Sequence, residues 1–221
     1  MRFVTLAVAA LGLTLSIGAA KAATISYSGS VPMADTNWNT TVSVPKFNPS
    51  LGTLTSATFT LGGTTTGSFL LLNFSGSQPV HVNSATVTTT LTLTDPNNNV
   101  IVVTTPMATL GNVDIPPNTT GMPITVPEPS GSDSDSATVT APGQLALFIG
   151  GGNIVLPITA AAVTTSNSTG GFPVIGSATT AGASWEVVYT YTPLEVPEPL
   201  GLSLLGAGLL GLGVLRLRRK G

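Results

Sequence analysis

The sequence predicts an all-β fold, and three observations support this. Between residues 24 and 191, short segments rich in Thr, Val and Ile alternate polar and apolar residues, as strands with one buried face do. Clusters of Gly, Pro and Asn separate the segments and mark turns. No stretch of this range repeats its apolar residues with the period of an amphipathic helix. We therefore expect an antiparallel β-sandwich of two sheets with about nine strands.

The individual strands follow from the alternating segments. They are expected at residues 24–28, 39–44, 53–61, 68–74, 80–94, 100–105, 144–149, 154–163 and 183–192. The fifth and sixth strands are joined by Asp-Pro-Asn-Asn-Asn at 95–99, a composition that favours a tight hairpin. In the last strand, four side chains share one face and are interpreted as core rather than as a ligand platform: Trp185, Val187, Tyr189 and Tyr191.

The fifth expected strand carries a regular row of hydroxyls. Every second residue from Thr86 to Thr94 is a threonine, so five hydroxyls share one face of the strand. Val87, Leu91 and Leu93 point the other way and are expected in the core. Such a row could order water or contact a flat surface, but threonine is also a good strand former on a solvated face, and we favour that interpretation.

The charges are distributed unevenly along the 221 residues. Six of the seven basic residues lie in the terminal segments, and only Lys46 lies between them. From residue 23 to 195, one lysine stands against eight acids, which leaves a net charge of −7. A nucleic-acid binder needs cations to neutralise phosphates, so we expect no nucleic-acid partner. Cysteine is absent, so no disulfide can stabilise the fold.

The first 22 residues have the pattern of a signal peptide. Arg2 precedes an apolar run over residues 3–17, and small residues follow at Ala20 and Ala22, the positions that a signal peptidase inspects. Cleavage is expected after Ala22 or Ala23. A permanent N-terminal anchor is the alternative, but the apolar run is short and polar strand-like sequence follows it at once.

The other end of the chain has three parts. Pro197-Glu198-Pro199 precedes an uncharged apolar run over residues 200–215, and a basic cluster over residues 216–220 follows. Sixteen helical residues span about 24 Å, slightly less than a typical hydrocarbon core. We expect a transmembrane helix at 200–215, with the basic residues on the cytoplasmic side.

This tripartite end resembles the PEP-CTERM sorting signal, over residues 196–221. The motif residues are Pro197, Glu198, Pro199, Arg216, Arg218 and Arg219. The resemblance implies cutting near the Pro-Glu-Pro motif by an exosortase, a membrane cysteine protease-transpeptidase, followed by release or transfer to the cell surface. A second Val-Pro-Glu-Pro at residues 126–129 lacks a following hydrophobic span, so we expect it to be a loop that the sorting machinery ignores.

The segment between the two ends, residues 23–195, resembles the choice-of-anchor E domain of bacterial surface proteins. The resemblance rests on residues 25–29, 36–38 and 44–54 near the start and on 188–193 at the end. It implies a β-sandwich ectodomain on an exported protein. The family has no assigned activity, so the resemblance implies no mechanism.

Few residues in this segment could carry chemistry. His81 is its only histidine, and no Gly-x-Ser-x-Gly elbow accompanies it, so an exposed strand histidine is favoured over a catalytic triad and we expect no enzyme. Asp133 and Asp135 are the best cation candidates, because hard oxygens at alternate positions suit calcium. The downstream Glu of a full calcium loop is absent, and a solvated acidic turn is favoured. No other cofactor is expected.

These observations lead to one functional hypothesis and two alternatives. We expect an exported protein, transiently anchored in the inner membrane and then at the cell surface or in the extracellular matrix. Signal peptidase and exosortase are its processing partners, and its sandwich has a non-catalytic structural or adhesive role, with extracellular polysaccharide as a partner. A specific glycan- or calcium-binding module is the first alternative, and a hydrolase is the more distant one.

Overall fold

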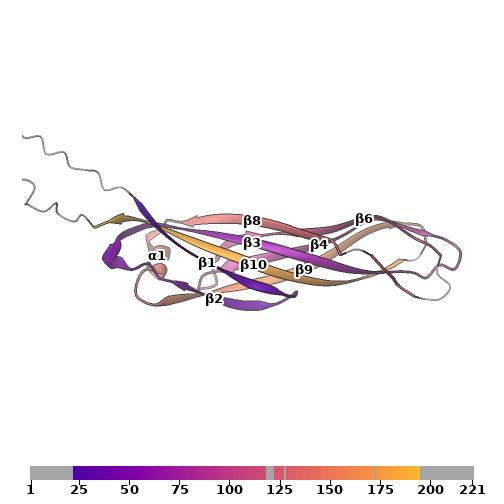
Figure 1. The fold of residues 1–221 in the computed structure, drawn as a ribbon, viewed down its shortest axis with the longest axis horizontal. Coiled ribbons are helices and arrows are strands. Elements are labelled where there is room, and N and C mark those ends of the chain that lie inside the picture. The colour runs from indigo at the N-terminus through magenta and orange to yellow at the C-terminus, as the bar shows by residue number, and fades with distance from the viewer. Residues whose placement is uncertain (1–21, 118–121, 127, 172, 195–221) are drawn as a thin grey trace, which may run out of the picture. The chain divides into compact units, whose positions relative to one another are not determined.

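The computed structural model describes residues 22–117, 122–126, 128–171 and 173–194, which belong to one compact unit, Ala22–Leu194. This part of the chain consists of two facing antiparallel sheets and a few short helical turns (Figure 1). The expected signal peptide at 1–22 lies outside the described residues except for Ala22, and so does the expected transmembrane helix at 200–215. Within the described ranges, no helix combines the length and apolarity needed to cross a membrane.

Ten strands are assigned in the described residues, five to each sheet. Sheet A consists of β1 (Ala23–Asp35), β10 (Pro173–Pro193), β3 (Gly52–Asn73), β8 (Ser130–Val139) and β7 (Ile124–Thr125). Sheet B consists of β2 (Asn39–Pro45), β9 (Asn153–Thr169), β4 (Val80–Thr94), β5 (Val100–Thr104) and β6 (Met107–Ile115). The all-β antiparallel two-sheet prediction is therefore confirmed.

The predicted alternation is clearest in β4, which has the predicted bounds. Ala85, Val87, Leu91 and Leu93 point inward and are buried, while the threonine row from Thr86 to Thr94 lies on the outer face. Burial of the apolar face drives this pairing, and the branched threonines suit the pleated outer face.

The predicted hairpin between β4 and β5 is also confirmed. Asp95 Oδ1 accepts hydrogen bonds from the amides of Asn97 (2.8 Å) and Asn99 (2.9 Å), and Asp95 Oδ2 accepts one from Asn99 Nδ2 (2.8 Å). Burial of Asp95 pushes its pKa up, but these hydrogen bonds outweigh burial and hold the pKa below its ordinary value. Asn98 has a left-handed φ of 64°, which asparagine tolerates in tight turns.

Two predicted strands are one. The strands predicted at 53–61 and 68–74 are parts of the single strand β3, which runs through Gly62, Gly63 and Gly67 without a turn and ends at Asn73. At Gly63 an added Cβ would lie 2.3 Å from Leu91 Cδ1 of the opposite sheet. This glycine allows the close approach of two sheets rather than a chain reversal.

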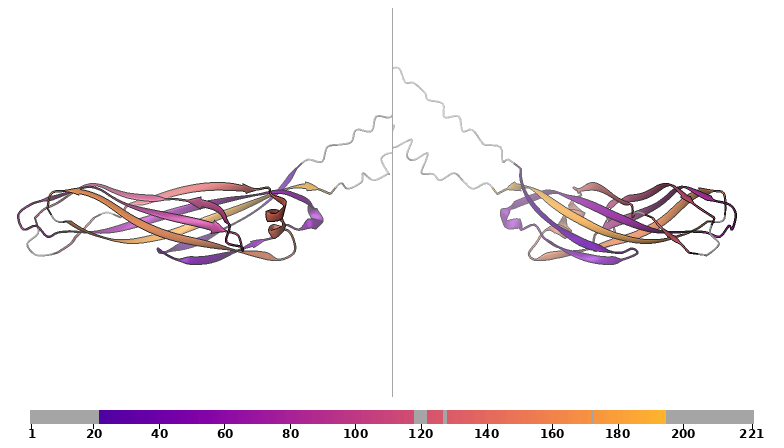
Figure 2. Two further views of the ribbon diagram at one scale, coloured as in Figure 1. Left: turned by 180° about the vertical axis from the view of Figure 1, so that it is seen from behind. Right: turned by 45° about the vertical axis from the view of Figure 1, so that its right-hand side comes forward.

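The prediction of a strand at 144–149 is wrong. This segment forms the short helix α1 (Pro142–Leu145) and the 3₁₀ turn η2 (Ala146–Phe148). Another 3₁₀ turn, η1 (Pro49–Leu51), lies much earlier in the chain, just before β3. Pro142 occupies the start of α1, where a proline is tolerated. Leu145 and Phe148, three residues apart, both enter the core, so a helical turn buries both side chains. The short coiled ribbon lies at one end of the sandwich (Figure 2).

One edge of each sheet is an interrupted strand. β5 and β6 both pair with β4 and are separated by Thr105 and Pro106, while β7 and β8 both pair with β3 and are separated by residues 126–129. The break on sheet A is the internal Val-Pro-Glu-Pro sequence, where the amide of Gly67 donates to the carbonyl of Pro129 (3.0 Å). Proline cannot donate to a ladder and is confined to such edges.

The core is divided in two along the strands. We call the "near core" the cluster at the end where the described chain begins and ends, with Phe47, Phe59, Phe148 and Tyr189 among its buried side chains. The "far core" lies at the other end, and its buried members are Phe69, Leu71, Val80, Val82, Ala85, Val87, Leu110, Ile115 and Val126. Between them, the Thr65 and Thr89 hydroxyls form a buried hydrogen bond of 2.7 Å from sheet to sheet.

Candidate functional site

The outer face of sheet A is covered with hydroxyl groups. Strand register brings the outward residues of four strands into rows that cross the sheet. One row consists of Ser28, Glu186, Thr60 and Ser136, and the next of Ser30, Ser184, Gly62 and Ser134. On the following row, Thr64 of β3 lies between Gly182 and Ser132. Each of these positions is exposed or half-buried except Gly182, which Met33 covers.

The small side chains at the centre of this face leave a shallow depression, which we call the trough. It consists of two adjoining hollows of about 410 and 460 Å³ that share Gly62, Ser134 and Ser184. At Gly62 an added Cβ would lie 2.5 Å from Ser184 Oγ, so the serine hydroxyl leans over the glycine. The trough is therefore floored by a glycine and bordered by hydroxyls.

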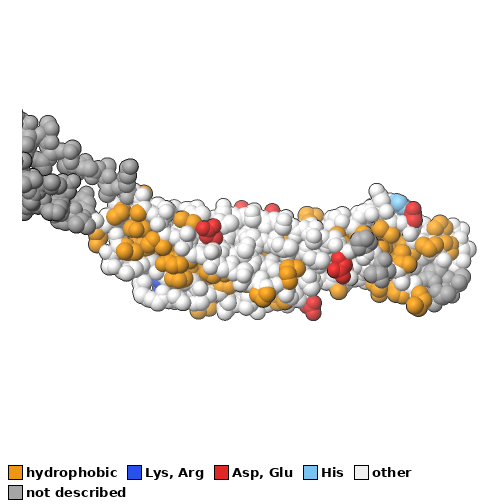
Figure 3. Space-filling model, in the orientation of Figure 1, with side chains coloured by type: hydrophobic (Ala, Val, Ile, Leu, Met, Phe, Trp, Pro, Cys, Tyr) orange, Lys and Arg blue, Asp and Glu red, His pale blue; other side chains and the backbone are white. Residues whose placement is uncertain are grey.

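Charge is scarce around the trough. Glu186 borders one hollow and Asp133 the other, but Asp133 Oδ2 is engaged by the Thr104 hydroxyl and the Thr105 amide, both at 2.9 Å. Across the face of the described domain seen in Figure 3, uncharged atoms also predominate and acidic side chains are scattered. This surface can exchange hydrogen bonds but cannot attract an anionic polymer.

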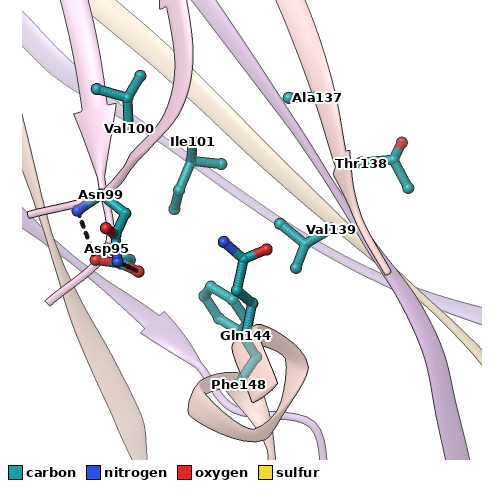
Figure 4. Close-up of a pocket in the computed structure, with 9 residues that line it drawn as sticks. All are labelled: Asp95, Asn99, Val100, Ile101, Ala137, Thr138, Val139, Gln144 and Phe148. Atoms are coloured by element: carbon teal, nitrogen blue, oxygen red, sulfur yellow. Dashed lines mark hydrogen bonds between the residues drawn. The ribbon is translucent and has the colours of Figure 1, made fainter. Parts of the chain in front are cut away.

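A second cavity lies near the β4–β5 hairpin and measures about 200 Å³. Asp95, Asn99, Gln144 and Phe148 line it together with aliphatic side chains, and the Gln144 amide points into it (Figure 4). Its volume is below the range of about 300–1,000 Å³ that small-molecule sites occupy. Asp95 already accepts three hydrogen bonds from its own turn, so its carboxylate serves the hairpin.

The predicted acidic turn at Asp133 and Asp135 is wrong as local structure, because both residues lie in strand β8. Asp133 links the edge of sheet A to the end of β5 in sheet B. Hydrogen bonds from the Thr105 amide, the Thr104 hydroxyl and the Ser134 amide lower the pKa of Asp133 and outweigh desolvation, which raises it. Asp135 Oδ1 accepts from the Ser136 amide (2.7 Å). In the described ranges, no three acidic, histidine or cysteine side chains gather to hold a metal, and calcium stays a prediction.

His81 lies on β4, opposite Asp114 of β6. Its Nδ1 is 2.5 Å from Asp114 Oδ1, and the two side chains are 40% and 83% exposed. The pair is a cross-strand contact on a solvated face, and among the described residues no serine or threonine hydroxyl bonds the imidazole.

The four aromatic and aliphatic side chains of the last strand lie in or against the near core, as predicted. Val187 and Tyr189 are fully buried, and the Tyr189 hydroxyl donates to the carbonyl of Pro45 (3.0 Å). Trp185 and Tyr191 pack against the same cluster. Burial raises the pKa of the Tyr189 phenol well above its ordinary value. The processing residues Ala20, Pro197, Glu198, Pro199, Arg216, Arg218 and Arg219 lie outside the described residues, and Ala22 is the first residue within them.

The trough itself was not predicted from the sequence, although a signal for it exists. Ser130, Ser132, Ser134 and Ser136 repeat with period two, as the outward residues of a strand do. The Gly, Ser and Asp content of this stretch favours a turn locally, which hides the alternation.

Comparison with known proteins adds little. No protein-family model matches the chain, and no curated protein matches it. The structure of infectious bursal disease virus Gx strain is similar at a TM-score of 0.16 and 10% identity, over 91% of this chain and 52% of that one. Eiger TNF from S. frugiperda is similar at a TM-score of 0.18 and 11% identity, over 62% and 64%. The chain thus spans about half the length of the viral protein, and at these scores neither likeness carries an argument.

Proposed function

We propose that this chain is an exported surface protein whose domain at residues 23–195 has a non-catalytic structural or adhesive role. Residues 1–22 are a signal peptide, and residues 196–221 are a PEP-CTERM sorting signal that holds the protein in the inner membrane until an exosortase processes it. The observation that carries the proposal is the order of Pro197-Glu198-Pro199, an uncharged run over 200–215 and a basic cluster over 216–220.

The construction of the domain supports this role. Its outer faces present hydroxyls rather than charges, and one edge of each sheet is interrupted at a proline, which limits edge-to-edge aggregation. Such a domain suits a crowded, polysaccharide-rich surface. The histidine at position 81 contacts an exposed carboxylate, which suits a surface residue better than a general base.

The experiment that tests the proposal replaces Pro197, Glu198 and Pro199 with alanines in a bacterium that has an exosortase. Loss of the recognition motif should leave the unprocessed chain in the inner membrane. Mass spectrometry of membrane and surface fractions then shows an intact C-terminus for the variant and a shortened one for the wild type.

The internal Val-Pro-Glu-Pro sequence supplies a matched control. Replacement of Pro127, Glu128 and Pro129 with alanines removes the same Pro-Glu-Pro sequence. The backbone carbonyl at position 129 can still accept the hydrogen bond from the Gly67 amide. Processing of this variant should equal that of the wild type. If the tail variant matures to the same C-terminus as the wild type, the proposal of exosortase sorting is wrong.

A further inference from the structure

We propose that the trough on the outer face of sheet A binds an uncharged polysaccharide chain. The inference rests on the proposed function and specifies the partner and the surface that contacts it. The first supporting observation is the number of unpaired hydroxyls in the trough. Within the described residues, the side-chain oxygens of Thr60, Ser134 and Ser184 have no hydrogen-bond partner in the protein. These hydroxyls and the Glu186 carboxylate therefore offer both donors and acceptors to a bound molecule.

Some hydroxyls elsewhere in the domain bond each other instead. On the same face but beyond the trough, Thr58 and Thr138 bond each other (2.9 Å), and on sheet B Thr86 and Thr109 do the same (3.0 Å). Cross-strand pairs of this kind satisfy each other and stabilise the sheet. In the trough, Ser184 of β10 lies opposite Gly62 of β3, which has no hydroxyl. The Ser184 hydroxyl can therefore bond a molecule outside the protein.

The shape of the trough fits an extended chain. It crosses the strands from β1 through β10 and β3 to β8, three interstrand spacings or about 14 Å. Thr60 and Glu186 form one side and Thr64 and Ser132 the other, with Gly62 on the floor. A depression of this length accommodates a short run of sugar rings.

The chemistry of the surface selects the class of ligand. The domain has one lysine against eight acids, so nucleic acids and uronic acid polymers are repelled. Protein interfaces concentrate aromatic residues, Met and Arg at their centre, whereas the centre of the trough is glycine and serine. A neutral polymer covered with hydroxyls matches a lining that is rich in hydroxyls and includes no Lys or Arg.

The trough offers no aromatic ring that stacks on a sugar, apart from the half-buried Trp185 at its border. Binding then depends on hydrogen bonds that water also makes, each with a net contribution of about 1 kcal/mol. Single sites should consequently be weak, and many copies on one surface would bind through avidity.

The test measures retention of the purified full chain on beads of curdlan, cellulose and mannan, which are uncharged, and of alginate, which is anionic. The wild type should bind at least one uncharged polysaccharide and should not bind alginate. Ser184→Gln fills the space over Gly62 and should weaken that binding by about tenfold, the equivalent of about 1.4 kcal/mol.

Two further changes guard against misfolding of that variant. Glu186→Gln keeps the shape of an exposed side chain and removes a charge-assisted hydrogen bond, so binding should weaken severalfold. Thr90→Gln is the matched control, because Thr90 is exposed on a central strand of sheet B, and its binding should equal that of the wild type.

Several results would overturn the inference. These are no retention on any uncharged polysaccharide, equal retention on alginate, wild-type binding by both trough variants, or loss of binding in Thr90→Gln. None of these touches export and processing, which the tail variant tests separately. Conversely, a failure of the sorting experiment leaves the bead assay on purified protein unaffected.

Discussion

The near core and the far core of the sandwich are built differently, although β3, β4, β9 and β10 run through both. In the near core, aromatic rings from sheets and loops meet: the Phe59 and Phe148 centroids are 5.0 Å apart, and those of Phe47 and Tyr189 are 6.2 Å apart. The far core is aliphatic apart from Phe69. The comparison teaches that one pair of sheets can be closed by two kinds of packing at its two ends.

The ends are also closed differently. Phe47 and Phe148 cover the near end, the first from the segment after β2 and the second from η2, whereas the far end is closed by the buried side chain of Asn73. Asn73 Nδ2 donates to the carbonyl of Gln78 (2.8 Å) and to that of Pro116 (3.2 Å), and Asn73 Oδ1 accepts from the Ser75 amide (2.9 Å). Burial of large rings is worth more than a few neutral hydrogen bonds, so we expect the near half to be the more stable.

The largest effect should come from truncating one phenylalanine in each core. Phe59 and Phe69 both lie on β3 and are both 1% exposed, so they form a matched pair. Phe59→Ala should lower the free energy of unfolding by about 4 kcal/mol and Phe69→Ala by about 3 kcal/mol. The difference arises because Phe59 also loses its contact with Phe148, which Phe69 lacks. Urea unfolding of the full chain measures both, and the reverse order would break the comparison.

The boundary between the cores should give an intermediate effect. Thr65→Val leaves the Thr89 hydroxyl buried without its partner and should cost about 2 kcal/mol, whereas after Thr89→Val the Thr65 hydroxyl still donates to the carbonyl of Thr180 (3.2 Å), so that variant should cost less. The double variant should cost clearly less than the sum, because both polar groups are then removed. The exposed pair Thr58 and Thr138 is the control, where Thr58→Val should stay within about 0.5 kcal/mol. Additive losses at the boundary would show that the two hydroxyls are not coupled.

The smallest effect should come from Asp133, whose carboxylate links the edge of sheet A to the end of β5 in sheet B. The pKa of Asp133 is lowered in the folded state, so its ionised form stabilises the fold above the ordinary carboxyl range. That contribution is lost as pH falls through this range to the lowered pKa. Asp133→Asn should therefore lower the urea midpoint at neutral pH and match the wild type in acid.

Asp135→Asn is the comparison for that experiment, because Asp135 bonds only the amide of the next residue and should have a smaller effect. The same measurement with millimolar calcium tests the calcium prediction. A rise of the wild-type midpoint that both variants lose would establish the site, and an unchanged midpoint would contradict it.

Much of the fold was predictable because some local patterns agree with long-range pairing. The alternation in β4 fixed its bounds, and the Asp-Pro-Asn-Asn-Asn composition identified the hairpin, since both signals act within a few residues. The long strand β3 was divided in error because glycine signals a turn locally, whereas Gly63 is required by Leu91 from the other sheet. That requirement comes from packing between the two sheets, so the residues next to Gly63 in the sequence do not indicate it.

The candidate site was harder to predict for the same reason. β8 becomes a strand because ten of its residues pair with β3, although its Gly, Ser and Asp content disfavours strands locally. The trough then depends on the register of four strands, which sets Ser184, Gly62 and Ser134 side by side. No spacing within one segment encodes that arrangement. The processing signals, by contrast, are read from contiguous residues.

The length of β10 has a mechanical consequence. This strand ends at Pro193, next to the end of the described domain, and is paired with β3 along its whole length and with β1 along half of it. A pull on Leu194 along the strand direction would load these two ladders in shear, so that many hydrogen bonds resist together rather than one after another. A domain held by its C-terminal end and gripped on the face of sheet A would transmit tension directly through this strand. The two ladders of β10 would therefore make the sandwich resistant to a pull applied at Leu194 along this strand.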